Sequence, residues 1–330
     1  MSAPQRNHGE LELGPWRSEE PPALEAFERQ PRERDGPFRP RHAAHWDWAF
    51  RRNPAGTRLF LARRGGRVVA RYGALPVRTR VLGETRTFAN LIDSAVWPGE
   101  PENEAWLALA QAFLAAHGGG DGDLVHYGWP DEPDLALGKL HLEHELLRAT
   151  SLLARDPGAG PLGLPDGVEE LARFGPQADV LYACCATHWH ASAIRDAAFL
   201  NWRFAEHPAR RFRLLGVRGG DVLRGYAVYH FDPELCSGSG LLMDWLVLPG
   251  DEQASERLLE GVLACARADR AAGLAASFPE WSPWSLYFQE RGFLHHPSEY
   301  LEVVRSSVPR FDMLWLRDNW WTTLADALIL

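Results

Sequence analysis

Lysine, cysteine and long apolar runs are scarce in this sequence. Its 35 basic residues include a single lysine, Lys139, so chemistry that depends on lysine has one candidate. Four cysteines among 330 residues match no disulfide framework, which favours a reducing compartment. No apolar run reaches the roughly 18 residues that a membrane span needs, and the N-terminal segment lacks a signal-peptide pattern. We therefore expect a cytoplasmic protein with no membrane partner.

The excess of acidic side chains argues against a general nucleic-acid binder. The formal charge is 35 − 44 = −9, whereas proteins that neutralise phosphates present a basic face. Nucleotide-binding and serine-hydrolase motifs are also missing. His188 and His190 follow two cysteines closely, but no C-x-x-C or H-E-x-x-H pattern accompanies them. We therefore expect neither a nucleic-acid partner nor a metal site.

The chain does contain a long internal repeat. The pattern W-x-F-x-x-[N/H]-P begins at Trp48 and again at Trp202, and D-x-x-V-x-P begins at Asp93 and again at Asp244. Gly-Gly pairs and short proline-containing segments match in the same order at similar offsets. Four matches in register predict a duplicated unit with small loop deletions.

Both copies are expected to share one order of elements. A helix ends at the tryptophan pattern, because the following proline stops it, and a hairpin with a Gly-Gly turn follows. The D-x-x-V-x-P segment is predicted as a central strand followed directly by an amphipathic helix. A short strand, a short helix and a last strand complete each copy. The predicted fold class is α/β, with two tandem units, each a mixed, mostly antiparallel sheet flanked by helices.

Composition suggests where the units begin and end. Residues 1–12 are polar and predicted to be disordered, and a linker rich in proline and glycine at 156–167 separates a first unit at 13–155 from a second at 168–307. The tail at 308–330 belongs to neither copy, and its apolar end predicts docking on the body. Its tryptophans suit packing between the units, a cleft lining or a homo-oligomer contact.

This order of elements, with V-x-P ending a strand directly before a long helix, resembles the GNAT superfamily of acyl-CoA-dependent N-acyltransferases. The segment from Ser285 to Phe293 is similar to the fourth conserved segment of that superfamily, A-x-x-Y-x-x-x-G-F. The resemblance covers residues 12–305. It implies a tandem GNAT-like protein that uses acetyl-CoA or another acyl-CoA.

The resemblance also implies where the acyl-CoA binds. In GNAT proteins the central strand separates from its neighbour and offers backbone groups to the pantetheine arm, and the next loop wraps the pyrophosphate at a helix N-terminus. The corresponding positions in this sequence are Ala95, Val96, Trp97 and Gly99 in the first copy and Leu246, Val247, Leu248 and Gly250 in the second.

Both loops depart from the superfamily pattern. In place of [R/Q]-x-x-G-x-[G/A], the chain has Gly-Glu-Pro-Glu-Asn-Glu after Pro98 and Gly-Asp-Glu-Gln-Ala-Ser-Glu after Pro249. Each carboxylate favours a helix N-terminus by roughly 0.3–1 kcal/mol, but it repels a pyrophosphate. Either the carboxylates point to solvent and the loops bind CoA, or the loops no longer hold it.

Four residues are candidates for acid–base catalysis. Asp93 and Asp244 lie at equivalent positions of the central strands in apolar surroundings, which suits either a general base or a carboxylate that fixes the strand. Tyr127 could line the first cleft, although a buried, hydrogen-bonded tyrosine is the favoured interpretation. Tyr287 is the candidate acid, but the superfamily tyrosine position falls on Phe288.

Three functions stay open at this point. The leading hypothesis is acyl transfer from a CoA thioester to an amine of a small metabolite or sugar. The alternative is a non-catalytic GNAT-fold scaffold or ligand-binding module, because both loops are acidic. The third is a CoA-independent transferase of the Fem type, which would use aminoacyl-tRNA and is disfavoured by the net charge of −9.

Overall fold

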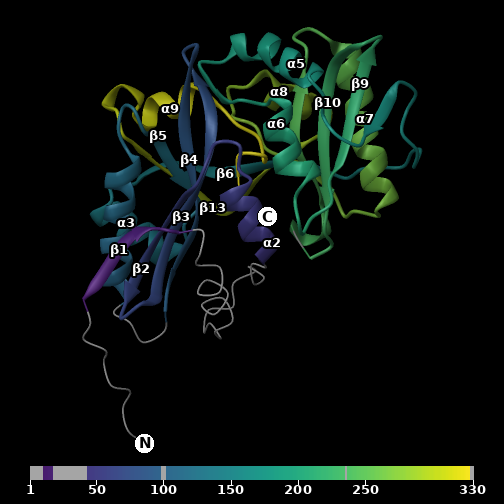
Figure 1. Cartoon of the computed structure of the whole chain (residues 1–330). Helices are drawn as coiled ribbons and strands as arrows, with labels where there is room; N and C mark the ends of the chain where they lie inside the picture. The colour runs from purple at the N-terminus through teal and green to yellow at the C-terminus, as the bar shows by residue number, and fades with distance from the viewer. Residues whose placement is uncertain (1–9, 18–42, 98–101, 235, 328–330) are drawn as a thin grey trace, which may run out of the picture.

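The computed structural model describes residues 10–17, 43–97, 102–234 and 236–327 (Figure 1). Its N-terminal half contains an antiparallel meander followed by alternating helices and strands, namely β2 (Arg58–Arg64), β3 (Arg67–Val81), β4 (Glu84–Val96), α3 (Glu102–His117), β5 (Asp123–Gly128), α4 (Glu132–His141) and β6 (Glu145–Arg155).

The C-terminal half has elements of the same kinds in the same order. They are β9 (Arg213–Gly219), β10 (Val222–Phe231), β11 (Gly240–Val247), α7 (Glu252–Ala268), β12 (Leu274–Ala276), α8 (Pro283–Glu290) and β13 (Leu294–Ser306). The predicted α/β class, with a mixed, mostly antiparallel sheet flanked by helices, is confirmed.

Shorter elements precede, connect and follow these two series. They are β1 (Leu11–Pro15), α2 (Ala43–Trp46), the π-helical turn η1 (Asp47–Arg51), β7 (Val168–Leu171), α5 (Gln177–Cys185), η2 (Ala186–His188), β8 (Ala191–Ala193), α6 (Ala197–Leu200), the π-helical turn η3 (Asn201–Ala205), η4 (Cys236–Gly238), η5 (Pro309–Phe311), α9 (Met313–Asn319) and β14 (Trp320–Trp321). The prediction of disorder over residues 1–12 was wrong for Leu11 and Glu12, because both pair with β2 as part of β1; residues 1–9 lie outside the described residues.

One continuous sheet joins the two halves. Its strand order is β1-β2-β3-β4-β5-β13-β6-β12-β11-β10-β9-β7. Strand β13 lies between β5 and β6, so the last strand of the second half is inserted into the first half, and β6 pairs in turn with β12. Figure 1 shows β6 and β13 between the two halves. The predicted boundaries at 155 and 168 stay predictions, but neither half completes its part of the sheet with its own strands.

In each half the central strand leaves its parallel neighbour part-way along. Strand β4 pairs with β5 up to Leu91 opposite Gly128, and residues 92–96 continue without a partner on that side. Strand β11 pairs with β12 up to Leu241 opposite Ala275, and residues 242–247 continue without a partner on that side, while β10 pairs with them on the other. We call these two places the first fork (residues 92–96) and the second fork (residues 242–247).

A β-bulge stands at the same place in both forks. On β4 the register shifts between the pairs Leu91–Ala74 and Asp93–Gly73, so one extra residue precedes the aspartate. On β11 the register shifts in the same way immediately before Asp244, which pairs with Val228. A bulge re-aims the side chains that follow it. The two aspartates therefore occupy equivalent positions in the sheet.

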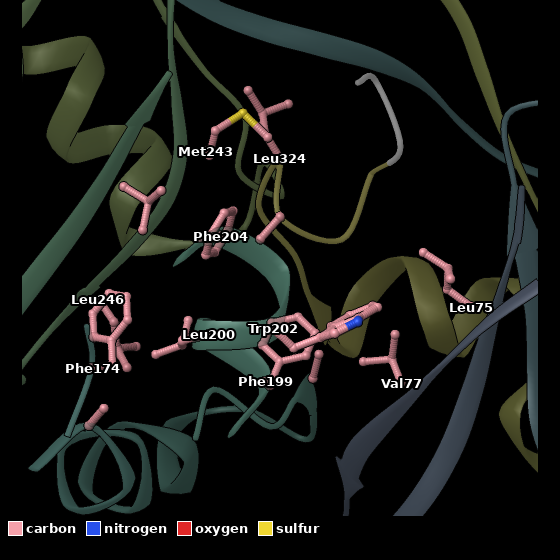
Figure 2. Close-up of a cluster of buried hydrophobic side chains, with 14 of the residues drawn as sticks. Leu75, Val77, Phe174, Phe199, Leu200, Trp202, Phe204, Met243, Leu246 and Leu324 are labelled. Atoms are coloured by element: carbon pink, nitrogen blue, oxygen red, sulfur yellow. The ribbon is translucent and has the colours of Figure 1, made fainter. Parts of the chain in front are cut away.

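The largest core cluster lies between the halves. Figure 2 shows Leu75 and Val77 of β3 on one side of this cluster and Leu246 of β11 on the other, with Trp202 between them. The repeated tryptophans meet here. The rings of Trp48 and Trp202 are stacked with centroids 4.8 Å apart, and each Nε1 donates to the other residue's carbonyl oxygen, at 2.6 and 2.8 Å.

The tail packs on both halves through its tryptophans. Strand β14 pairs in parallel with β8. Trp320 packs edge-on against Phe88 and Tyr127 of the first half, and Trp321 stacks on Trp189 with ring centroids 4.1 Å apart. Among the described residues, none of the helices has the length and hydrophobicity needed to cross a bilayer.

Candidate active site

Asp93 is held in a buried ion pair on the face of the sheet that packs between the halves. Arg71, on the neighbouring strand β3, donates from Nε to both carboxylate oxygens at 2.9 Å. The guanidinium of Arg71 also lies over the ring of Trp46, 5.5 Å from its centroid. Because a guanidinium stabilises the carboxylate form, this arrangement favours a structural role for Asp93 over proton abstraction.

Asp244 is also buried and paired with an arginine, but it has more partners. Arg195 Nε donates at 3.1 Å to its Oδ2, Tyr226 donates to the same oxygen at 2.8 Å, and Thr323 of the tail donates to Oδ1 at 2.7 Å. Arg195 also donates to both oxygens of Asp326, at 2.9 and 2.5 Å. Burial opposes the charge of Arg195, but the two aspartates keep its pKa well above the ordinary arginine value. Asp244 therefore anchors the tail to the central strand.

The two tyrosine candidates occupy different surroundings. Tyr127 is buried, its hydroxyl donates to the carbonyl oxygen of Asp326 at 3.3 Å, and burial raises its pKa well above the ordinary value. This position agrees with the favoured interpretation of a buried, hydrogen-bonded residue. Tyr287 is half-buried in α8 with the guanidinium of Arg291 3.6 Å from its ring centroid, and burial raises its pKa to about 12. Tyr287 belongs to the second fork, where its ring faces Trp245.

The two forks differ most at one pair of equivalent positions, 94 and 245. Ser94 is exposed in the first fork, and the neighbouring predicted residues Ala95, Val96 and Trp97 are half-buried. Trp245 is fully buried in the second fork, where its ring packs edge-on against Trp284 and Phe288 of α8, with centroids 5.6 and 5.3 Å away.

The predicted cofactor-binding residues of the second fork are covered. Leu246 and Val247 are buried, and Leu248 is half-buried at the end of the strand. The carbonyl oxygen of Val247 accepts a hydrogen bond from the Cys185 thiol of α5 at 3.3 Å. Protein groups therefore occupy the second fork, whereas Ser94 of the first fork is exposed.

The second loop is occupied by a protein carboxylate. Gly250 takes a positive φ of 78°, which turns the chain into α7. Asp251 then caps the helix, accepting from the Ala254 N–H at 3.0 Å, and Arg224 binds both its oxygens at 2.6 Å. At the N-terminus of α7 a protein carboxylate therefore accepts from the backbone N–H of Ala254. Gly99 of the first loop lies outside the described residues.

A cavity of about 510 Å³ lies where the two halves and the tail meet. It is lined by the residue after β5, by β6 and β13, by the segment after β12 and by the tail, including Trp129, Arg148, Phe278, Trp281, Glu302 and Asp326. This volume is in the range of small-molecule sites. Sequence reasoning missed the site, although a charged residue within each predicted last strand, at 148 and 302, was a usable signal.

Arg148 and Glu302 form the polar centre of this cavity. Arg148 Nε lies 2.9 Å from Glu302 Oε2. The side chain of Glu302 is only 5% exposed, and burial raises its pKa although Arg148 opposes the shift. Trp129 Nε1 donates to the hydroxyl of Thr150 at 2.9 Å, which fixes the indole at the cavity wall.

No protein-family model and no curated protein matches this chain. Solved structures do match. A probable N-acyltransferase from Enterococcus faecalis aligns with a TM-score of 0.62 at 12% identity, over 90% of this chain and 73% of that one. The N-myristoyltransferase of Saccharomyces cerevisiae with bound myristoyl-CoA aligns with a TM-score of 0.56 at 12% identity, over 89% and 82%.

A tandem GNAT protein from the clavulanic acid biosynthesis pathway aligns with a TM-score of 0.52 at 16% identity, over 91% of this chain and 99% of that one. Identities this low establish the fold and nothing finer. The chain has the GNAT fold, as its resemblance to that superfamily implied.

Proposed function

We propose that this protein is an acyl-CoA-dependent N-acyltransferase whose acyl donor binds in the first fork. The fold supports the reaction class, since one structure that shares it is an N-myristoyltransferase with bound myristoyl-CoA. The observation that carries the proposal is the contrast between exposed Ser94 and fully buried Trp245 at equivalent positions. The C-terminal half, whose fork is filled, then serves as scaffold.

The backbone of the first fork supports this assignment. Trp97 N donates to the carbonyl oxygen of Val69 on β3 at 2.7 Å. In an antiparallel pair the backbone groups of successive residues point alternately to the two sides of the strand. Ser94 and Val96 therefore direct their N–H and C=O groups away from β3, towards the side that β5 has left. These are the groups we assign to the amides of the pantetheine arm and to the thioester carbonyl.

The chemistry required of this site is acyl transfer to an amine. The acceptor reacts as its neutral amine: its nitrogen attacks the thioester carbon, the C–N bond forms and the C–S bond breaks. The proton that the nitrogen loses goes to the sulfur, so that coenzyme A leaves as its thiol. The Arg71–Asp93 pair lies beside the bulge of the same strand. We assign it to fixing the strand so that the backbone donors keep their positions.

Filling the first fork tests this function. Ser94→Trp places an indole where the second fork already has one, and we expect it to weaken the binding of acetyl-CoA and of longer acyl-CoAs by about tenfold or more, because the ring occupies the pantetheine channel. Isothermal titration calorimetry measures the affinity.

Thr85→Trp is the matched control for this test. Thr85 is exposed on the same strand β4, next to its hairpin turn and away from the fork. Its replacement should leave acyl-CoA affinity unchanged. The wild-type protein failing to bind any acyl-CoA at millimolar concentration would remove the proposed function, and equal affinities of Ser94→Trp and the control would remove the first fork as the site.

A further inference from the structure

The cavity between the halves is lined by Arg148, whose guanidinium has buried N–H groups without well-aligned acceptors in the described part of the chain. Within the described residues, Arg148 Nε and Nη2 are buried and make no aligned hydrogen bond, although Nε lies 2.9 Å from Glu302 Oε2. A guanidinium carries five N–H donors in a fixed plane, and buried donors without acceptors are costly. The cavity therefore favours a ligand that brings an anionic acceptor, such as a carboxylate, to Arg148.

Glu302 favours a cationic group of a ligand in the same cavity, as Arg148 favours an anionic one. This carboxylate is almost fully buried, and burial raises its pKa, Arg148 lowers it, and Asp326 raises it further. Among the described residues, Arg148 is the one cationic side chain that forms a salt bridge with this carboxylate. A ligand ammonium group would supply a second cationic partner.

Three aromatic side chains form part of the remaining wall, beside small, polar and charged residues such as Ser151, Glu280 and Asp318. Trp129, Phe278 and Trp281 line the cavity, and Phe278 is buried whereas Trp281 is exposed at the rim. Such side chains favour an apolar group of the ligand, since removing apolar surface from water is favourable. A ligand with an apolar group beside its charged groups would therefore fit all three kinds of wall.

Residues of the cavity wall are connected to the strands at the base of the first fork. Glu302 is adjacent in β13 to Val303, which pairs with Gly128, the last residue of β5 before β4 separates from it. Asn90 of β4 and Tyr127 of β5 both donate to the carbonyl oxygen of Asp326, a residue of the cavity wall. A ligand in this cavity thus lies beside the strands that carry the proposed acyl donor.

We propose that this cavity is the acceptor site and that its substrate is an α-amino acid with an apolar side chain, with Glu302 receiving the ammonium group and Arg148 the carboxylate. The aromatic part of the wall holds the side chain. This assignment rests on the proposed function for its role as acceptor site, but amino-acid binding can be measured without any acyl-CoA.

The first test compares three probes on the wild-type protein without acyl-CoA. L-phenylalanine carries both charged groups, phenethylamine lacks the carboxylate, and hydrocinnamate lacks the ammonium group. Isothermal titration should show L-phenylalanine binding at least about tenfold more tightly than either analogue, because each analogue leaves one buried charge unpaired. Equal binding of L-phenylalanine and phenethylamine, or no binding of L-phenylalanine at millimolar concentration, would overturn the assignment.

The second test uses single variants to abolish the preference for L-phenylalanine over each of its analogues. Arg148→Gln should reduce L-phenylalanine affinity to that of phenethylamine, and Glu302→Gln should reduce it to that of hydrocinnamate. Arg213→Gln is the control, because Arg213 pairs with Glu170 at 2.8 Å on strands away from the cavity. If Arg148→Gln still binds L-phenylalanine more tightly than phenethylamine by the wild-type factor, the assignment is contradicted. If L-phenylalanine binds as expected while no acyl-CoA binds, the proposed function fails and the amino-acid site stands.

Discussion

His144 places an imidazole in the core without a hydrogen-bond partner for either ring nitrogen within the described residues. Burial, together with the charges of His126 and Arg305, lowers its pKa to about 4. The imidazole is therefore neutral in the folded protein at pH values where the unfolded chain would bind a proton. This single side chain couples unfolding to proton uptake.

A pH-dependent stability follows from His144. Because its folded pKa is depressed, its contribution is present above the unfolded value near 6.5 and is lost as the pH falls towards 4. Between pH 7 and pH 5 we expect this histidine to lower the free energy of unfolding by about 2 kcal/mol. Urea denaturation at both pH values measures it, and His144→Phe should lose most of that difference. An identical pH dependence in the variant would contradict the assignment.

At the scale of elements, helix α4 is fitted to the same histidine. Gly138 is buried in α4, and a Cβ there would approach the ring of His144 more closely than side chains do. Glycine in a helix interior is unfavourable by about 1 kcal/mol relative to alanine, so here close packing decides the residue. Helix α8 occupies the equivalent place in the second half and carries Tyr287 and Phe288, which pack against Trp245. The helix beside the second fork thus contributes aromatic side chains that help to fill that fork.

Gly138→Ala tests that packing. Although alanine favours the helix, we expect a net loss of about 1–3 kcal/mol in the free energy of unfolding, because the ring of His144 must move in a filled core. Gly120→Ala is the control, since nothing lies within 4 Å of a Cβ at that position, and its effect should stay below about 0.5 kcal/mol. Equal effects of the two substitutions would show that the ring yields freely.

At the scale of the whole molecule, exchange of the last strands makes the halves interdependent. Strand β13 pairs with both β5 and β6, and β6 pairs with β13 and β12. The tail adds contacts to both central strands through Asn90 and Asp244. A half on its own would leave a strand edge unpaired and the core between the halves exposed, which favours aggregation.

Cleavage of the linker tests this interdependence. A protease site inserted between Leu162 and Gly163 lies in an exposed segment without regular structure. After cleavage we expect both fragments to elute together in size-exclusion chromatography and to unfold in one transition, whereas the N-terminal fragment expressed alone should not fold. The uncut insertion variant is the control. Fragments that separate in native buffer and remain folded would contradict the expectation.

The sequence by itself determined the order of elements and the equivalence of Trp48 to Trp202 and of Asp93 to Asp244 in the repeat, because turn residues, hydrophobic periodicity and repeated motifs act over short stretches of chain. It also showed that both loops carry carboxylates in place of the superfamily pattern. Only the tertiary structure decided which fork is filled, since the exposure of Ser94 and the burial of Trp245 depend on helices distant in sequence. The exchange of β6 and β13 and the meeting of Arg148 with Glu302 were likewise beyond local pattern, because they arise from contacts between residues more than a hundred positions apart.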